Sequence, residues 1–244
     1  MIEINKIYNM DCLEGMKLIP DNSIDLIVTD PPYKTTSRGS SGGTGGILKE
    51  EINKRGKVFK YNDIELNEWL PELYRVLKDT GHAYIMSNNK NLKDMLIEIE
   101  NAGFNIYKTL IWAKNSPITN MYYMDSHEYI IFCRKGKAKR INNCGTKSVL
   151  NVDNPRNKVH PTEKPVELME VLINNSSQEG ELVLDPFMGS GTTAIACINN
   201  NRNYIGFELD KQYYDIANVR ICKAISEHNI DNVNQRRNSD NGLP

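Results

Sequence analysis

Several sequence features that would place a protein in a large class are missing from this chain. No uninterrupted apolar stretch approaches the roughly 20 residues that a membrane-spanning helix needs. The opening residues, MIEINKIYNMD, do not place an apolar segment after a basic one, so no export signal is expected. These absences favour a cytoplasmic protein that packs a globular core.

Cysteine patterns of zinc sites and disulfide frameworks are also missing. The cysteines are scattered and odd in number, and they are Cys12, Cys133, Cys144, Cys197 and Cys222. Structural zinc sites normally need cysteines or histidines at short, repeated spacings, and none is found here. We therefore expect no bound metal and reduced thiols, and we interpret Cys12 and Cys197 as packing residues.

The chain has little net charge, since it sums to -1, but the charge is unevenly distributed. Residues 134–158 hold eight Lys or Arg and one acid, whereas residues 34–60 hold seven and two. The remainder therefore carries -13. Two basic segments on an acidic body indicate a surface that meets a polyanion, although two solvated loops would give the same pattern.

Apolar runs alternate with helical patterns along most of the chain after Asp30. Strands are predicted at IDLIV, HAYIMS, ELVLD and NYIGFEL, which begin at residues 24, 82, 181 and 203. Helical spacing predicts helices between them, including one over residues 64–81 that Gly81 would end. FNIYKTLIWAK and HEYIIFCRKG are predicted to pair as an antiparallel hairpin at the sheet edge. The alternation is typical of an α/β fold with a doubly wound, mostly parallel, Rossmann-like sheet.

No internal repeat or clear linker divides the chain, so a single domain is predicted over residues 1–228. Within it, residues 34–60 begin with KTTSRGSSGGTGG, which is too rich in Gly and Ser to pack and is interpreted as a mobile loop. Residues 134–159 are basic and irregular. Residues 229–244 form a polar C-terminal tail that is expected to fray.

The stretch VLDPFMGSGTTA places two glycines between a predicted strand and a predicted helix. Gly189, Gly191 and Ala194 fit the G-x-G-x-x-G/A fingerprint of nucleotide-binding folds, in which amides at the helix start hold an anion. The next strand leads to Glu208, nineteen residues after Gly189, where a carboxylate can accept hydrogen bonds from two ribose hydroxyls. A tight packing turn is the alternative, but the whole pattern favours a nucleoside cofactor.

The position of this fingerprint bears on the kind of cofactor. About 55 residues follow it, too few for the second nucleotide-binding half of a dinucleotide fold. The sheet must then be completed by earlier strands, and IDLIVTD would bring the sequence DPPY, Asp30–Tyr33, to the same edge as the glycine turn. A cofactor with one nucleoside is therefore favoured over NAD. For DPPY alone, a proline-terminated strand with a tyrosine at its rim is the structural alternative.

Three motifs together resemble those of one family. DPPY, HPTEKPVEL from His160 and DPFMGSGTT from Asp185 are similar to motifs of the S-adenosylmethionine-dependent DNA amino-methyltransferases, and their order resembles the beta group. The resemblance runs from about residue 8 to 220. It implies a seven-stranded methyltransferase sheet with permuted strand order. Met10, where a glycine is common, and the lack of a large inserted recognition domain are departures.

The resemblance to this family implies that the DPPY residues catalyse the reaction. An exocyclic amine is a poor nucleophile because its lone pair is delocalised into the base. Asp30 would accept one amine proton in a hydrogen bond, and the Pro31 carbonyl, held by the Pro31-Pro32 pair, would accept the other. Tyr33 would stack on a base that has left the duplex. Catalysis would then rest on positioning and electrostatics.

The resemblance also implies a set of cofactor-binding residues, which are Asp11, Cys12, His160, Thr162, Lys164, Asp185, Pro186, Phe187, Gly189, Gly191, Thr192, Thr193, Glu208 and Leu209. Asp11 would read the cofactor adenine and Glu208 would hold the ribose. Asp185 would lie near the amino group of the methionine end, and Lys164 would face its carboxylate. For His160, a hydrogen-bonded structural histidine is an equal alternative.

Double-stranded DNA is the expected partner, and the basic segments are its predicted contacts. One segment follows DPPY directly and could close over the flipped base. The other occupies the position where the family usually carries target recognition. The residues assigned to DNA are Lys34, Arg38, Arg134, Lys135, Lys137, Lys139 and Arg140. The sequence leaves open whether the chain forms a homodimer.

We predict methylation at N6 of adenine, because Asp at the first motif position resembles the adenine enzymes and Ser the cytosine ones. Cytosine N4 is the first alternative, since Asp30 and Pro31 could activate either amine. A nicotinamide-dependent oxidoreductase is supported by the glycine fingerprint alone. A methyltransferase acting on RNA or protein glutamine is disfavoured by Asp30 and by the motif order. A non-catalytic DNA-binding module is disfavoured by the intact DPPY.

Overall fold

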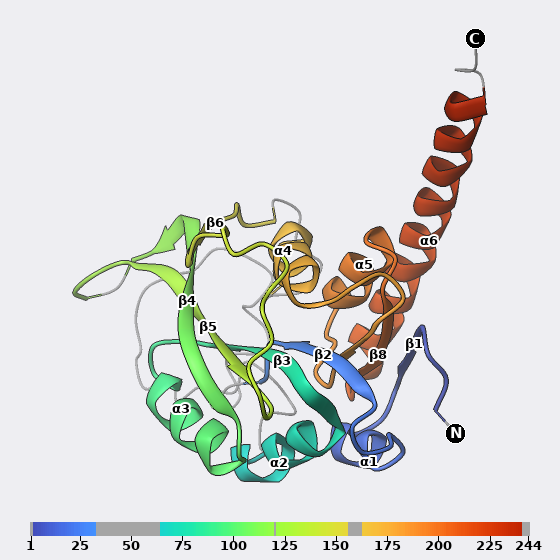
Figure 1. Cartoon of the computed structure of the whole chain (residues 1–244). Coiled ribbons are helices and arrows are strands. Elements are labelled where there is room, and N and C mark those ends of the chain that lie inside the picture. The colour runs from blue at the N-terminus through green and yellow to red at the C-terminus, as the bar shows by residue number, and fades with distance from the viewer. Residues whose placement is uncertain (1, 33–63, 120, 156–162, 241–244) are drawn as a thin grey trace.

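The computed structural model describes residues 2–32, 64–119, 121–155 and 163–240 (Figure 1). The strands are β1 (Lys6–Tyr8), β2 (Ile24–Thr29), β3 (Leu77–Ser87), β4 (Asn105–Ile118), β5 (Asp125–Arg134), β6 (Val149–Asn151), β7 (Leu182–Asp185) and β8 (Asn203–Phe207). The helices are α1 (Cys12–Met16), α2 (Leu66–Val76), α3 (Leu92–Asn101), α4 (Val166–Ser176), α5 (Thr192–Asn199) and α6 (Lys211–Asp240). None of the described helices is long and apolar enough to cross a membrane.

The described strands form one sheet in the order β1-β8-β7-β2-β3-β5-β4-β6. All neighbouring pairs are parallel except the two that include β5. The α/β class and the mostly parallel sheet are therefore confirmed. Because the parallel strands share one direction, their carboxyl ends meet at a single edge of the sheet, where open sheets bind ligands.

Two details of the predicted sheet are wrong. The sheet of the described residues has eight strands rather than seven. Its two outermost strands, β1 and β6, have three residues each, which is too few for a periodic sequence pattern. The antiparallel hairpin of β4 and β5 is present, but β6 pairs with the outer side of β4. The hairpin is thus separated from the side of the sheet by one further strand, β6.

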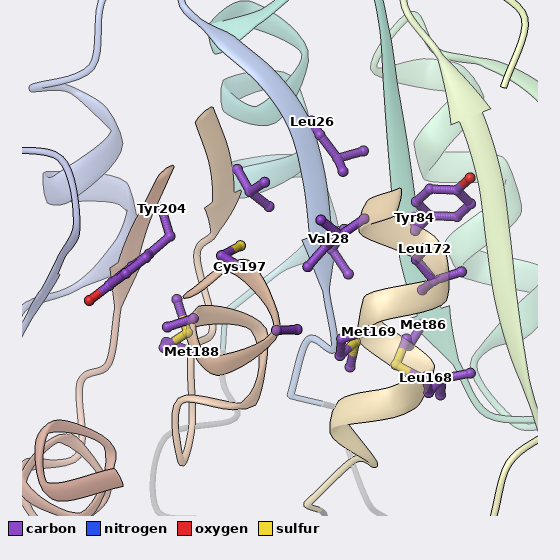
Figure 2. Close-up of a cluster of buried hydrophobic side chains, with 14 of the residues drawn as sticks. Leu26, Val28, Tyr84, Met86, Leu168, Met169, Leu172, Met188, Cys197 and Tyr204 are labelled. Atoms are coloured by element: carbon purple, nitrogen blue, oxygen red, sulfur yellow. The ribbon is translucent and has the colours of Figure 1, made fainter. Parts of the chain in front are cut away.

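Helices cover both faces of the sheet, with α1, α2 and α3 on one side and α4, α5 and α6 on the other (Figure 1). Leu26 and Val28 of β2 pack toward α4 and α5, whereas Ile24 and Ile27 pack toward α1 and α2. Figure 2 shows the first of these clusters, with Val28 beside helix α4. All four side chains are fully buried, and each contributes about 1.5–3 kcal/mol through burial. The interpretation of IDLIV as a strand buried on both faces is correct.

The predicted helix over residues 64–81 ends earlier than expected. It stops at Val76, and Leu77 already has extended backbone angles, φ -69° and ψ 135°. Leu77 pairs with Ile24 of β2, so β3 starts there and Gly81 lies inside the strand. Pairing with a neighbouring buried strand has overridden the helical spacing of the sequence.

Residues 229–240 of the polar C-terminal segment belong to helix α6 in the structure, and the fraying of this segment remains a prediction. Helix α6 continues to Asp240, beyond the predicted boundary at residue 228, and it projects away from the sheet in Figure 1. Ala217 and Ile221, in its first half, are buried in the core. Once a packed turn has formed, each further residue adds a backbone hydrogen bond, which explains how a polar segment continues the helix.

Candidate active site

Four neighbouring strands bring the predicted motifs to the same edge of the sheet. Strand β2 leads into Asp30, β7 ends at Asp185, β8 leads into Glu208, and β1 leads into the turn that carries Asp11. Strands β1, β8, β7 and β2 are consecutive in the sheet and mutually parallel. The structure therefore places residues 30–32, the described part of the DPPY motif, at the end of the strand next to the one that leads into the glycine turn, in line with the order of the motifs.

Asp185 is a buried carboxylate that is fixed on both oxygens. Its Oδ1 accepts hydrogen bonds from Thr29 Oγ1 at 2.8 Å and from the Phe187 amide at 3.1 Å. Its Oδ2 accepts one from Thr193 Oγ1 at 2.6 Å. Burial raises the pKa of Asp185 to about 6, although these hydrogen bonds favour the charged form. The site thus holds a buried carboxylate that a cationic ligand group would stabilise.

The glycine turn needs its glycines for backbone geometry. Gly189 and Gly191 have φ angles of +56° and +85°, a region that other residues rarely adopt. A Cβ atom on Gly191 would also lie 3.2 Å from Cβ of Ala217 on α6. The turn can therefore approach both α6 and a ligand closely.

Glu208 is tied to the same turn. Its Oε2 accepts a hydrogen bond from the Gly189 amide at 2.8 Å, and its Oε1 accepts one from the Asp210 amide at 2.8 Å. Burial raises the pKa of Glu208 to about 7, against the effect of these two hydrogen bonds. Its carboxyl group consequently titrates near neutral pH.

Asp11 and Cys12 have structural roles at the start of α1. Asp11 Oδ1 caps the helix by accepting hydrogen bonds from the Leu13 amide at 2.8 Å and the Glu14 amide at 3.3 Å. Burial raises the pKa of the Cys12 thiol to about 12, which agrees with its interpretation as a packing residue. A contact of Asp11 or of the Cys12 amide with a cofactor remains a prediction.

The remaining predicted cofactor residues differ in how far they are buried. Pro186 and Thr192 are buried, whereas Leu209 is exposed. Phe187 is half-buried, and its ring meets the edge of the buried Trp69 on α2, with centroids 5.1 Å apart and an interplanar angle of 87°. Aromatic contacts of this geometry are favourable, so the Phe187 ring is held in place.

Arg220 of α6 joins the glycine turn to the HPTEKP motif. Its Nη1 donates hydrogen bonds to the carbonyl oxygen and to Oγ of Ser190, both at 2.7 Å. Its Nη2 forms an ion pair with Glu163 at 2.6 Å. This pair of contacts was not predicted from the sequence, because no local spacing reveals a contact between residues 57 positions apart.

Lys164 lies against the predicted catalytic carboxylate. Its buried ammonium forms an ion pair with Asp30 Oδ2 and lies 3.3 Å from Glu128 Oε2, and Glu128 in turn pairs with Lys114. Burial disfavours the ammonium, but the two carboxylates outweigh this and raise the pKa of Lys164. The predicted contact of Lys164 with the cofactor carboxylate remains a prediction. The sequence analysis overlooked both Glu128 and Lys114.

The described residues include only part of the DPPY and HPTEKP motifs. Pro31 is buried and Pro32 is half-buried, directly after Asp30. Five predicted residues lie outside the described residues, and these are Tyr33, Lys34, Arg38, His160 and Thr162. The predicted loop over residues 34–60 lies outside them as well.

Lys135 is a clear correction among the predicted DNA contacts. It is buried, and its Nζ donates hydrogen bonds to the carbonyl oxygens of Tyr74 at 2.7 Å and Leu77 at 2.9 Å, and to Asn22 Oδ1 at 2.8 Å. The ammonium thus satisfies carbonyl groups at the end of α2. It is not available to a phosphate, and its assignment to DNA is wrong.

The other predicted DNA contacts from this segment lie far from Asp30. Arg134 pairs with His82 and with Asn105, the first residue of β4, so it lies toward the opposite edge of the sheet from Asp30. Asn142 bonds to carbonyl groups at the C-terminal end of α4. Lys137, Lys139 and Arg140, between these two points, are exposed. This placement speaks against their contact with DNA at Asp30.

Comparisons with known proteins identify relatives of the whole domain. A family model for N6 and N4 methyltransferases, described as DNA methylase, matches residues 24–219. The type II methyltransferase M.HinfI of Haemophilus influenzae is 32% identical over 247 residues, covering 89% of this chain and 68% of that protein. The type II methyltransferase M2.MboI of Moraxella bovis is 30% identical over 239 residues, covering 88% and 86%.

Solved structures of DNA methyltransferases also match the chain. A crystal structure of M1.HpyAVI in complex with S-adenosylmethionine is 28% identical, has a TM-score of 0.67, and matches over 88% of this chain and 98% of that one. PvuII DNA methyltransferase, described as cytosine-N4-specific, has a TM-score of 0.69 at 18% identity, over 91% and 92% of the two chains. At that identity the likeness supports the fold alone.

Proposed function

This chain belongs to the DNA methylase family of N6 and N4 amino-methyltransferases, and we propose that it methylates N6 of adenine in DNA. The methyl donor is S-adenosylmethionine. The observation that carries the proposal is the position of Asp30, which follows β2 at the sheet edge that also holds Asp185 and Glu208. A carboxylate for the amine, the buried Asp185 and the half-buried Glu208 thus share one edge of the sheet.

The described residues fit S-adenosylmethionine chemically. Its amino group is a cation, and Asp185 is a buried carboxylate at the end of β7. Its ribose offers two hydroxyl donors, and Glu208 is a carboxylate that follows β8 and bonds to the glycine turn. Its sulfonium supplies an electrophilic methyl group. Gly189 and Gly191 leave room for close approach by such a molecule.

In the proposed reaction Asp30 and Pro31 prepare the amine. Hydrogen bonds from its two protons to the Asp30 carboxylate and the Pro31 carbonyl would free the nitrogen lone pair. A carbon–nitrogen bond would then form as the carbon–sulfur bond breaks, the electron pair would stay on sulfur, and the amine proton that is bonded to Asp30 would pass to its carboxylate and on to water. The base has to leave the duplex to reach Asp30, and Tyr33 is proposed to stack on it.

The choice of adenine rests on Asp30. The same pair of acceptors would serve N4 of cytosine, so geometry does not separate the two bases. Asp rather than Ser at this position resembles the adenine enzymes. Cytosine N4 remains the second candidate.

The product nucleoside tests the proposed function. Mixed-sequence DNA incubated with the purified protein and S-adenosylmethionine is expected to yield N6-methyldeoxyadenosine after digestion, identified by mass. N4-methyldeoxycytidine as the main product would overturn the choice of base. Methylation at carbon 5 of cytosine would overturn the mechanism as well, because that chemistry needs a covalent nucleophile. Absence of any methylated nucleoside would overturn the function.

The far basic segment gives a second prediction. Neutralising Lys137, Lys139 and Arg140 together is expected to leave the log–log salt dependence of DNA binding unchanged, because these side chains lie away from Asp30. A slope that falls by about 0.9 for each lost phosphate contact would show that DNA extends to this edge. Filter binding across a salt series, with S-adenosylmethionine affinity measured as the control for folding, distinguishes the two results.

A further inference from the structure

Four side chains of alternating charge form a connected row that ends at Asp30. Lys114 of β4 pairs with Glu128 Oε1 of β5, Lys164 lies 3.3 Å from Glu128 Oε2, and Lys164 also pairs with Asp30 Oδ2. None of the four side chains exposes more than 19% of its surface. The formal charges sum to zero, and each inner charge lies between two of opposite sign. Buried charges need such pairing, since one left alone in a protein interior is costly.

One atom of this row is left incompletely satisfied. Within the described part of the chain, Glu128 Oε2 is buried and has no hydrogen-bond donor in good geometry. The nearby cation is the ammonium of Lys164, at a distance that allows an ion pair but without the alignment of a hydrogen bond. A small movement of Nζ toward Glu128 would supply the missing hydrogen bond and lengthen its contact with Asp30.

The contact between Lys164 and Asp30 conflicts with the proposed reaction. Asp30 has to accept a hydrogen bond from the target amine, and the ammonium already occupies its Oδ2. A cation paired with that oxygen makes the carboxylate a weaker hydrogen-bond acceptor for the amine. A second acceptor that takes Lys164 would leave more negative charge on Asp30 for the amine.

We propose that Glu128 is a positioning residue that draws the Lys164 ammonium off Asp30 when the target amine docks. This inference rests on the proposed function and adds a role that the family motifs do not assign. Lys114 holds Glu128 through Oε1 and leaves Oε2 for Lys164. The ammonium stays buried between two carboxylates throughout, so it never loses its pairing.

The charge states of the row agree with this role. Burial disfavours the carboxylate of Glu128, but the ammonium groups of Lys164 and Lys114 prevail and lower the pKa of Glu128. The pKa of Lys164 is raised by its two carboxylates. Both groups are therefore charged at neutral pH. Replacing Glu128 with the isosteric Gln keeps the shape of the site and removes the charge that competes for Lys164.

Steady-state kinetics on the Glu128→Gln variant provide the test. At saturating S-adenosylmethionine, kcat is expected to fall about tenfold, which corresponds to about 1.4 kcal/mol, while the Kd of the cofactor changes less than twofold. Glu72→Gln is the matched control. Glu72 is a half-buried partner of Arg75 on α2, and its loss is expected to leave kcat unchanged.

A double-mutant cycle separates positioning from a general structural effect. In a Lys164→Met background there is no ammonium to draw away, so Glu128→Gln is expected to have no further effect on kcat. A wild-type kcat in folded Glu128→Gln, or the same loss with and without Lys164, would overturn the inference. Lys114→Met, which frees Glu128 Oε1 as a competing acceptor, is expected to reduce kcat less than Glu128→Gln, and a larger loss would also count against it. If the wild-type protein methylates DNA but the Glu128 variants do not behave as expected, the role of Glu128 is wrong and the proposed function stands.

Discussion

Replacing Asp30 with alanine is expected to lower methyl transfer by about 10³-fold or more while S-adenosylmethionine still binds. The carboxylate is the acceptor that the amine needs, and the Pro31 carbonyl alone leaves one amine proton without a partner. The predicted cofactor residues at the end of β7, after β8 and in the glycine turn are expected to keep their geometry. Single-turnover methylation of DNA, with the cofactor Kd from calorimetry, measures both effects.

Two further variants sharpen this experiment. Asp30→Asn keeps a single oxygen acceptor without the charge, and it is expected to recover only a small part of the lost rate. Asp21→Ala removes an exposed carboxylate that pairs with Arg75, and it is expected to react at the wild-type rate. Near-normal methylation by Asp30→Ala would show that another group activates the amine. Its melting temperature is needed too, because the change leaves the Lys164 ammonium with one carboxylate fewer.

The main features of the fold and the site could be predicted because they depend on local signals. IDLIV is apolar at every position except Asp25, which a strand buried on both faces requires. Asp30 directly follows such a strand, Asp185 is the last residue of another, and parallel strands end at a common edge. Glycines between a strand and a helix predict a turn with left-handed backbone, and Gly189 and Gly191 have it.

The errors arise where long-range contacts decide the outcome. Lys135 looks like any other basic residue in its segment, yet the carbonyl groups at the end of α2 hold it in the interior. The contact between Lys164 and Asp30 joins residues that are 134 positions apart, and composition carries no sign of it. The alternation of charge through Glu128 is likewise visible only after β4 and β5 have paired.

S-adenosylmethionine is expected to bind about tenfold more tightly at pH 8 than at pH 6, with Glu208 as the titrating group. Burial raises the pKa of Glu208 to about 7, so its carboxyl group is mostly protonated at pH 6 and mostly ionised at pH 8. The ribose hydroxyls donate hydrogen bonds to the ionised form. Apparent affinity scales with the fraction of protein in the competent state, and a tenfold change in that fraction gives a tenfold change in Kd. Binding at pH 7 should also release about half a proton per molecule bound, which calorimetry in two buffers of different ionisation enthalpy detects.

The Glu208→Gln variant distinguishes the titration of Glu208 from that of Asp185. Hydrogen bonds to a charged group contribute about 1.5–3 kcal/mol, so the variant is expected to bind S-adenosylmethionine about 10- to 100-fold more weakly at pH 8. Its affinity should no longer change between pH 8 and pH 7. Asp185, whose pKa burial raises to about 6, is the other carboxylate that titrates nearby, and its effect is confined to lower pH. A pH dependence through 7 that survives in Glu208→Gln would assign the proton to another group and remove Glu208 from the ribose.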